Sequence, residues 1–326
     1  MEWSGKMNAD LESLGSPLRD LEREFKEKIE PYRSDLWRYC RTLTRSPWDA
    51  EDLVQDTLLR AFSLLPKLYQ PIESKAYLFR IATNRWIDQR RKQERIEMRE
   101  DMEENNAAGE FDYQLLENLE HLVHILTPVQ YVSIILTDAF LYKGKEVAQI
   151  IGTTEASVHA HVSRARKSLR KYSPVSNAKS GTSASVDSLQ ADPVIATMLE
   201  GFRSKDPERI ASVLHEEIQT EIVHSGLEIG LEETKRHSLE DWYQIVQDQQ
   251  AIIGEYRLRL LWGAPVIVEL EEKEDGKRYL NNLHRIEIED GLVISWRFYC
   301  FSWDLMKQAA EELDVKLNAA YFYHLY

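Results

Sequence analysis

Basic side chains are concentrated between residues 141 and 172, where seven lysines and arginines stand against two acidic residues. Such cations neutralise phosphates, so this local excess indicates a nucleic-acid-binding surface, although the whole chain carries a net charge of −14. Phosphate contacts position a protein on nucleic acid, whereas contacts to base edges specify sequence. We expect phosphate contacts from Arg164, Arg166 and Lys167, and base contacts from His159, Ala160 and Ser163.

Aromatic and basic residues alternate in a second stretch, between residues 69 and 95. Bases can stack on aromatic rings while cations hold the backbone, a combination that suits single-stranded nucleic acid. The loop at 69–75 contains Pro71 and could form a rigid pocket for a flipped base. The alternative is that several aromatics fill a core beside solvated arginines. The candidates in this stretch are Tyr69, Lys75, Tyr77, Arg80, Arg85 and Arg91.

A third stretch, "SPWDAEDLVQDTLLRAF" at 46–62, combines an apolar stripe with an acidic face. Ser46 can cap a helix, and Pro47 suits its first position. Asp49 and Asp52 have no lysine or arginine at the spacing that would pair them on the same helix. A solvated surface is one explanation, and a contact with another molecule is the other. The face consists of Asp49, Asp52, Gln55 and Asp56.

These residues need elements to hold them. Residues 17–95 and 113–172 read as helices, separated by an acidic linker at 96–112. A flexible linker at 173–191 precedes residues 192–326, which read as α+β. There we expect helices at about 193–204, 207–215 and 232–250, and strands around two Asp-Gly turns at 275–276 and 290–291. The strands predict a curved antiparallel sheet.

The basic stretch has the pattern of a helix-turn-helix. A short helix at about 145–151 is followed by Gly152, which suits the left-handed turn conformation. Thr153 or Thr154 can cap a second helix, which such a motif places in the DNA major groove. The alternative is a plain helical hairpin with a basic tip. The inward face of the second helix is expected to be Val158, Val162, Ala165 and Leu169.

Composition limits the remaining choices. The 326 residues suffice for two or three domains, and no apolar run reaches about 18 residues, so no membrane span is expected. Cys40 and Cys300 lack metal-ligand spacing and predict free thiols in a reducing cytoplasm. We therefore expect a cytoplasmic protein with no cofactor and no metal. Charge is uneven, with a net −12 over 192–326 and −2 over 1–191.

The three stretches together resemble the extracytoplasmic-function (ECF) class of bacterial sigma factors. "DAEDLVQDTLLRAF" is similar to the polymerase-binding region of that class, and "AYLFRIATNRWIDQRRK" to its −10 recognition and melting helix. "LTPVQYVSIILTDAFLYKGKEVAQIIGTTEASVHAHVSRARKSL" is similar to its −35 domain. The resemblance implies two all-α sigma domains, region 2 at 17–95 and region 4, a helix-turn-helix, at 113–172.

The resemblance also implies partners for the candidate residues. Contacts to the clamp helices of the largest subunit of RNA polymerase fall on Asp49, Asp52, Leu53, Gln55, Asp56 and Phe62, with Leu53 and Phe62 supporting the packing. Contacts to the −10 element fall on Tyr69, Lys75, Tyr77, Arg80, Asn84, Arg85 and Arg91. Contacts to the −35 element fall on Thr154, His159, Ala160, Ser163, Arg164, Arg166 and Lys167.

Residues 192–326 resemble SnoaL-like domains, cone-shaped α+β folds that often enclose a pocket. The pocket candidates are His224, Trp242, Trp262, His284 and Trp296. The simpler interpretation is that these aromatics form the core, and we expect no catalytic residues. A small ligand of this domain is a further partner implied by the pocket.

Three functions compete at this point. The first is a sigma factor for transcription initiation, with the last domain as a built-in regulator. The second is a DNA-binding regulator that does not engage polymerase. The third is a cone-fold enzyme or ligand-binding domain fused to a DNA-binding part.

Overall fold

The structure is a computed structural model that describes residues 23–64 (except 26 and 30), 75–100, 125–171, 192–247 and 254–318. Contacts divide the chain into two compact units, here called the N-terminal unit (Met1–Lys179) and the C-terminal unit (Ser180–Tyr326). The predicted linker at 173–191 lies outside the described residues. The predicted linker at 96–112 does so only from residue 101, because α3 continues to Glu100.

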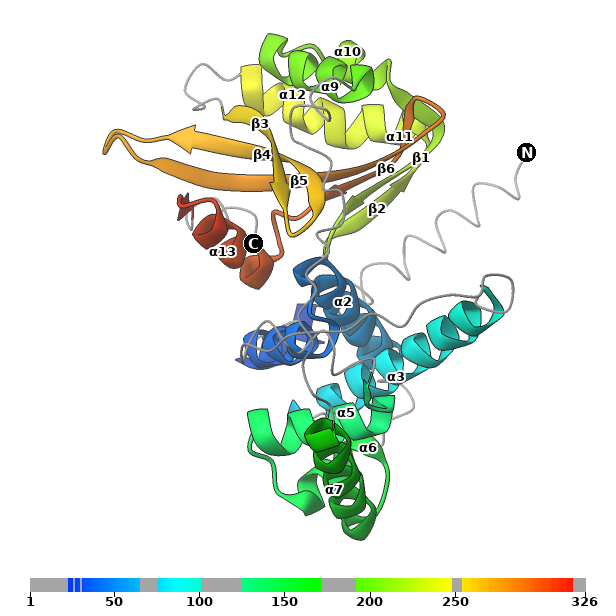
Figure 1. Cartoon of the computed structure of the whole chain (residues 1–326). Helices are drawn as coiled ribbons and strands as arrows, with labels where there is room; N and C mark the ends of the chain where they lie inside the picture. Colours follow the sequence, from blue (N-terminus) through cyan, green and yellow to red (C-terminus); the bar gives the residue numbers. More distant parts are fainter. Residues whose placement is uncertain are drawn as a thin grey trace, which may run out of the picture. The chain divides into compact units, whose positions relative to one another are not determined.

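The N-terminal unit is helical (Figure 1). Residues 31–44 are helical and lead to the labelled elements. These are α2 (Pro47–Leu64), α3 (Lys75–Glu100), α5 (Pro128–Ile134), the π-helical η2 (Ile135–Ala139), α6 (Gly144–Ile151) and α7 (Glu155–Lys171).

Local signals set the ends of these helices. The Ser46 hydroxyl accepts a hydrogen bond from the Asp49 backbone N–H at 3.3 Å, and Pro47 occupies the first position of α2, as predicted. Gly152 ends α6 with φ at 70°, a left-handed conformation that glycine adopts without strain. The Thr154 hydroxyl accepts from the Ser157 N–H at 3.2 Å, so the predicted cap of α7 is confirmed.

One hydrophobic core holds the helices on both sides of residues 101–124. Phe79 of α3 stacks on Tyr39 at 4.2 Å between ring centroids and meets Phe140 edge-on at 5.9 Å. Trp86, about two helical turns further along α3, stacks on Tyr131 of α5 with 5.2 Å between the ring centroids. Consequently α3 packs against α2, α5 and α6, while α7 packs on α5 and α6.

The C-terminal unit is a seven-stranded sheet with helices, which confirms the predicted α+β class. The strands follow the order β2-β1-β6-β5-β4-β3, with β7 beside β5. Their bounds are β1 (Leu214–Ile222), β2 (Gly226–Ile229), β3 (Glu255–Leu261), β4 (Ala264–Glu272), β5 (Arg278–Glu289), β6 (Leu292–Phe298) and β7 (Lys316–Leu317). The prediction of a purely antiparallel sheet is wrong, because β1 pairs with β6, and β5 with β7, in parallel.

Helices cover the sheet unequally. Figure 1 shows α9, α10, α11 and α12 together over one face, and α13 on the opposite side. Their bounds are α9 (Pro193–Ser204), α10 (Pro207–Ala211), α11 (Leu231–Thr234), the π-helical η3 (Lys235–Leu239), α12 (Glu240–Gln247) and α13 (Trp303–Glu312). The helix predicted at 207–215 is shorter than expected, because the chain turns into β1 at Leu214.

Both Asp-Gly turns lie where the sequence predicts them. Asp290 and Gly291 join β5 to β6 with φ values of 49° and 77°, the left-handed pair that a two-residue hairpin requires. Gly276, with φ at 70°, lies between β4 and β5. These hairpins fix the antiparallel half of the sheet.

Candidate functional site

The acidic face of α2 is held outward by its buried opposite side. Glu51 is buried there and accepts a hydrogen bond from Trp37 Nε1 at 2.8 Å. Leu53, also on that side, is only 1% exposed. A side chain buried to that degree cannot itself contact a partner, so its predicted contribution is limited to supporting the packing. Phe62 is half-buried and meets Phe25 edge-on at 5.5 Å.

An exposed leucine lies within the acidic face, and sequence reasoning missed it. Leu59 is 62% exposed and follows Gln55 and Asp56 by four and three residues, which places it on the same side of α2. Leu58 and Leu59 are adjacent, and only one of the two fits the inward stripe. A single exposed leucine is common on protein surfaces, so Leu59 adds an apolar contact point to the acidic face without by itself defining a binding surface.

Asp56 is paired, so the prediction of an entirely unpaired acidic face is wrong. Its Oδ2 accepts hydrogen bonds from Arg85 of α3, from Nε at 3.0 Å and from Nη2. The partner lies 29 residues away, beyond the range in which intrahelical pairing rules apply. Asp49 is exposed, while Asp52 and Gln55 are half-buried.

The aromatic residues of α3 divide between core and surface. Phe79 and Trp86 are buried, as the alternative interpretation holds, and Tyr77 is half-buried. Lys75 pairs with Asp35 at 2.8 Å, and this hydrogen bond raises the pKa of Lys75 above its ordinary value. Tyr69 lies outside the described residues. The exposed candidates on α3 are Arg80, Asn84, Arg85 and Arg91.

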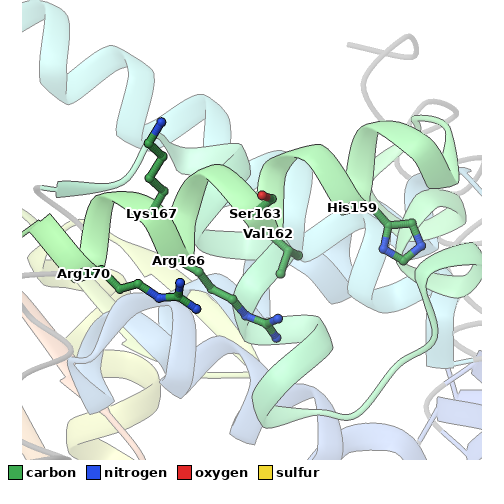
Figure 2. Close-up of a pocket in the computed structure, with 6 residues that line it drawn as sticks. All are labelled: His159, Val162, Ser163, Arg166, Lys167 and Arg170. Atoms are coloured by element: carbon green, nitrogen blue, oxygen red, sulfur yellow. The ribbon is translucent and has the colours of Figure 1, made fainter.

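The outward side of α7 carries the basic candidates. His159, Ser163, Arg164 and Lys167 are exposed, and Ala160 is half-buried. Figure 2 shows Lys167 pointing to one side of the helix, and Arg166 and Arg170 pointing to the other. A hollow of about 440 Å³ runs along this helix, lined by His159, Val162, Ser163, Arg166, Lys167 and Arg170.

Two arginines on α7 differ in their surroundings. Arg166 forms an ion pair with Asp138 of η2 at 2.8 Å. Arg164 Nη2 lies 3.2 Å from His161 Nδ1, and in the described part of the chain it forms no ion pair. Burial, and after it the positive charge of Arg164, lowers the pKa of His161. Arg164 is therefore better placed than Arg166 for a phosphate.

Tyr131 joins α5 to the first helices of the unit. Its hydroxyl donates to the Thr42 carbonyl at 2.8 Å and accepts from Arg45 Nε at 3.0 Å. Burial raises the pKa of Tyr131 to about 12, against the opposing effect of nearby arginines. Arg80 of α3 also approaches the α6–α7 turn, with Nη2 at 3.9 Å from the point that a Cβ on Gly152 would occupy.

In the C-terminal unit, three of the five predicted pocket residues meet around Phe202 of α9. Its ring centroid lies 5.3 Å from Trp242, 5.5 Å from His284 and 6.0 Å from Trp296. His284 is buried, with Nδ1 accepting from Trp296 Nε1 at 3.3 Å and Nε2 at 3.8 Å from Glu269 Oε2.

The other two candidates, His224 and Trp262, lie in turns between strands, with φ values of 69° and 48°. Trp242, His284 and Trp296 thus belong to a packed aromatic cluster around Phe202, whereas His224 and Trp262 lie where strands turn. Both cysteines are buried free thiols, and burial raises the pKa of Cys300 to about 12.

Among the described residues, no group of three or more His, Cys, Asp or Glu side chains could hold a metal ion. Nor does any helix in the described ranges have the length and apolar character needed to cross a membrane.

Comparisons with known proteins agree with the helical site. Residues 29–96 match the family "Sigma-70 region 2", which includes α2 and most of α3. The ECF RNA polymerase sigma factor SigG of Mycobacterium tuberculosis is 30% identical over 228 residues. The alignment covers 60% of this chain and 60% of that relative's length. The N-terminal unit thus contains a segment that matches sigma-70 region 2, and the resemblance to ECF sigma factors is confirmed.

Two solved structures are also similar. The ECF sigma factor SigJ of Mycobacterium tuberculosis is 18% identical, covering 83% of this chain and 95% of its own, with a TM-score of 0.31. An NTF2-like protein of unknown function from Cytophaga hutchinsonii is 11% identical, covering 37% of this chain and 93% of its own, with a TM-score of 0.23.

Proposed function

We propose that this chain is an ECF-type sigma factor, which binds core RNA polymerase and directs it to promoters. The observation that carries the proposal is the acidic face of α2 with Leu59 exposed among its carboxylates, inside the matched sigma-70 region 2. An exposed apolar side chain beside acidic ones suits a partner surface that is apolar and basic. By resemblance, that surface belongs to the clamp helices of the largest polymerase subunit.

The exposed side of α3 is proposed to contact the −10 element. Arg80, Arg85 and Arg91 supply cations, and Asn84 supplies an amide that can bond a base edge. Phe79 and Trp86 are excluded from base stacking because they are buried. Tyr77, which is half-buried, is the aromatic candidate left on this helix for stacking.

The α6–α7 pair is proposed to act as region 4, a helix-turn-helix that reads the −35 element. The left-handed Gly152, the Thr154 cap and the buried inner side of α7 support this assignment. Arg164 and Lys167 would contact phosphates. His159, Ala160 and Ser163 would face base edges.

The C-terminal unit is proposed to be a built-in regulator. Residues 192–326 carry a net charge of −12, whereas 141–172 carry +5. Residues 173–191 join the two, and a tether of about twenty residues gives an effective concentration near the millimolar range. Opposite charges at that concentration favour association. A small ligand could shift the balance only by binding one arrangement better than the other.

Run-off transcription and binding to core polymerase test the first proposal. Leu59→Asp should weaken core binding tenfold or more, which is about 1.4 kcal/mol, since it places a charge where an apolar side chain would meet the partner. Ile245→Asp is the matched control, because Ile245 is 57% exposed but lies in the C-terminal unit. Equal binding of core polymerase by both variants and the original chain would show that the acidic face of α2 does not contact polymerase.

Truncation tests the regulator. A stop codon after Tyr172 should change run-off activity relative to the full chain, and rising salt should narrow the difference because screening weakens charge attraction. Activity that is the same for both proteins at every salt concentration would contradict a regulatory role while leaving the sigma-factor assignment intact.

A further inference from the structure

One ion pair connects the proposed polymerase-binding face of α2 with the proposed −10 surface of α3. Asp56 belongs to the acidic face of α2, and Arg85 belongs to the exposed side of α3. Two nitrogens of the guanidinium, Nε and Nη2, donate to the same carboxylate oxygen. The side chain of Asp56 remains 36% exposed and that of Arg85 44% exposed, so partners can reach both of them.

The pair imposes a competition on each partner. A guanidinium held by a carboxylate has to leave it, or share it, before it can contact a phosphate. Equally, a cation on a protein partner that reaches Asp56 displaces Arg85. Exposed ion pairs are weak, so the exchange changes affinity by about two- to fivefold.

From this arrangement, and resting on the proposed function, we infer that Asp56 is a positioning residue that restrains Arg85 in the free chain. Contact of a basic polymerase surface with the acidic face releases Arg85 towards single-stranded promoter DNA. Because binding free energies are linked, DNA that engages Arg85 also frees Asp56 for polymerase by the same factor. Each partner therefore strengthens the binding of the other.

A matched pair of variants separates release of Arg85 from loss of charge. Asp56→Asn and Asp49→Asn each remove one negative charge from α2. Asp49 is exposed, and in the described part of the chain it makes no ion pair. Both variants lose one negative charge, whereas only Asp56→Asn releases the guanidinium.

The experiment measures binding of a fluorescent oligo(dT) to the full chain without polymerase, over a series of low salt concentrations. Asp56→Asn should bind about two- to fivefold more tightly than Asp49→Asn. Its plot of log K against log salt should be steeper by about 0.7, the slope of one added phosphate contact on a single strand. Asp56→Glu should behave like the original chain, because it keeps the pair.

A second substitution identifies the responsible cation. The double variant Asp56→Asn with Arg85→Gln should lose both the gain in affinity and the steeper slope. Equal binding by the two single asparagine variants, a gain that survives Arg85→Gln, or no binding by any variant at the lowest salt overturns the inference. Run-off transcription by the original chain is read separately, so failure of the sigma-factor proposal is distinguishable from failure of the restraint.

Discussion

The two arginine-rich helices, α3 and α7, look alike in sequence but differ in what the fold leaves available. α3 packs against three other helices, and two of its basic side chains, Lys75 and Arg85, form ion pairs with Asp35 and Asp56. α7 packs against two helices, and of its exposed basic residues Arg166 is paired with a carboxylate. Of the basic DNA-contact candidates, two of the four on α3 are paired with carboxylates, against one of the three on α7, so the candidate list overstates the cationic surface of α3 more than that of α7.

The difference has a physical origin. A helix in the middle of a bundle borders several neighbours, so its polar side chains meet groups from other elements at the margins of each contact. A helix at the edge of a bundle meets such groups on one side only. Assignment of DNA contacts from sequence is consequently more secure for α7 than for α3.

The largest test of this comparison is core substitution. Phe79→Ala should lower the free energy of unfolding of the N-terminal unit by about 3–5 kcal/mol, because it leaves a large cavity beside Tyr39 and Phe140. Val162→Ala on α7 should cost about 1–2 kcal/mol, since two methyl groups are lost at the margin of the core. Urea unfolding measures both, and equal costs would mean that α7 is as central as α3.

A smaller effect distinguishes the two arginines of α7. Arg164→Ala should weaken binding to duplex DNA for all sequences and reduce the salt slope by about 0.9, the value for one phosphate contact. Arg166→Ala should change the slope less, because Asp138 already neutralises that guanidinium. Salt titrations of DNA binding by the two variants check this prediction. A larger change for Arg166→Ala would reverse the two roles.

Local chemistry explains which features the sequence predicts. The start of α2 at Pro47, the turn at Gly152 and the hairpin at Asp290-Gly291 each depend on one or two residues with restricted backbone preferences. The inner side of α7 follows from helical periodicity alone. These are the parts of the fold and of the −35 candidate surface that could be derived without a structure.

Features that depend on distant partners could not be derived in this way. The Asp56–Arg85 pair joins residues 29 positions apart, and the parallel pairing of β1 with β6 joins strands separated by most of the C-terminal unit. No local signal specifies either contact. Leu59 is a different case, because helical periodicity places Leu58 and not Leu59 on the inward stripe, so the signal for an outward leucine is present in the sequence.

The smallest predicted effect concerns Tyr131. Its hydroxyl joins α5, on which α7 packs, to Thr42 and Arg45 near the start of the unit. Tyr131→Phe should cost about 1 kcal/mol at neutral pH, since the hydrogen bonds to Thr42 and Arg45 are lost. The pKa of Tyr131 is raised by burial to about 12, from an ordinary value of 10.0. A raised pKa means that the folded state retains a proton which the unfolded state releases.

Stability from this group is therefore complete below pH 10 and is lost as the pH rises from about 10 towards 12. At pH 11.5 the loss should reach about 2 kcal/mol in the original chain, and Tyr131→Phe should lack this component although other tyrosines still titrate. Unfolding measured at pH 7 and pH 11.5 for both proteins gives the difference. Equal losses of unfolding free energy in both proteins between pH 7 and pH 11.5 would mean that the fold does not hold the Tyr131 hydroxyl in its protonated form.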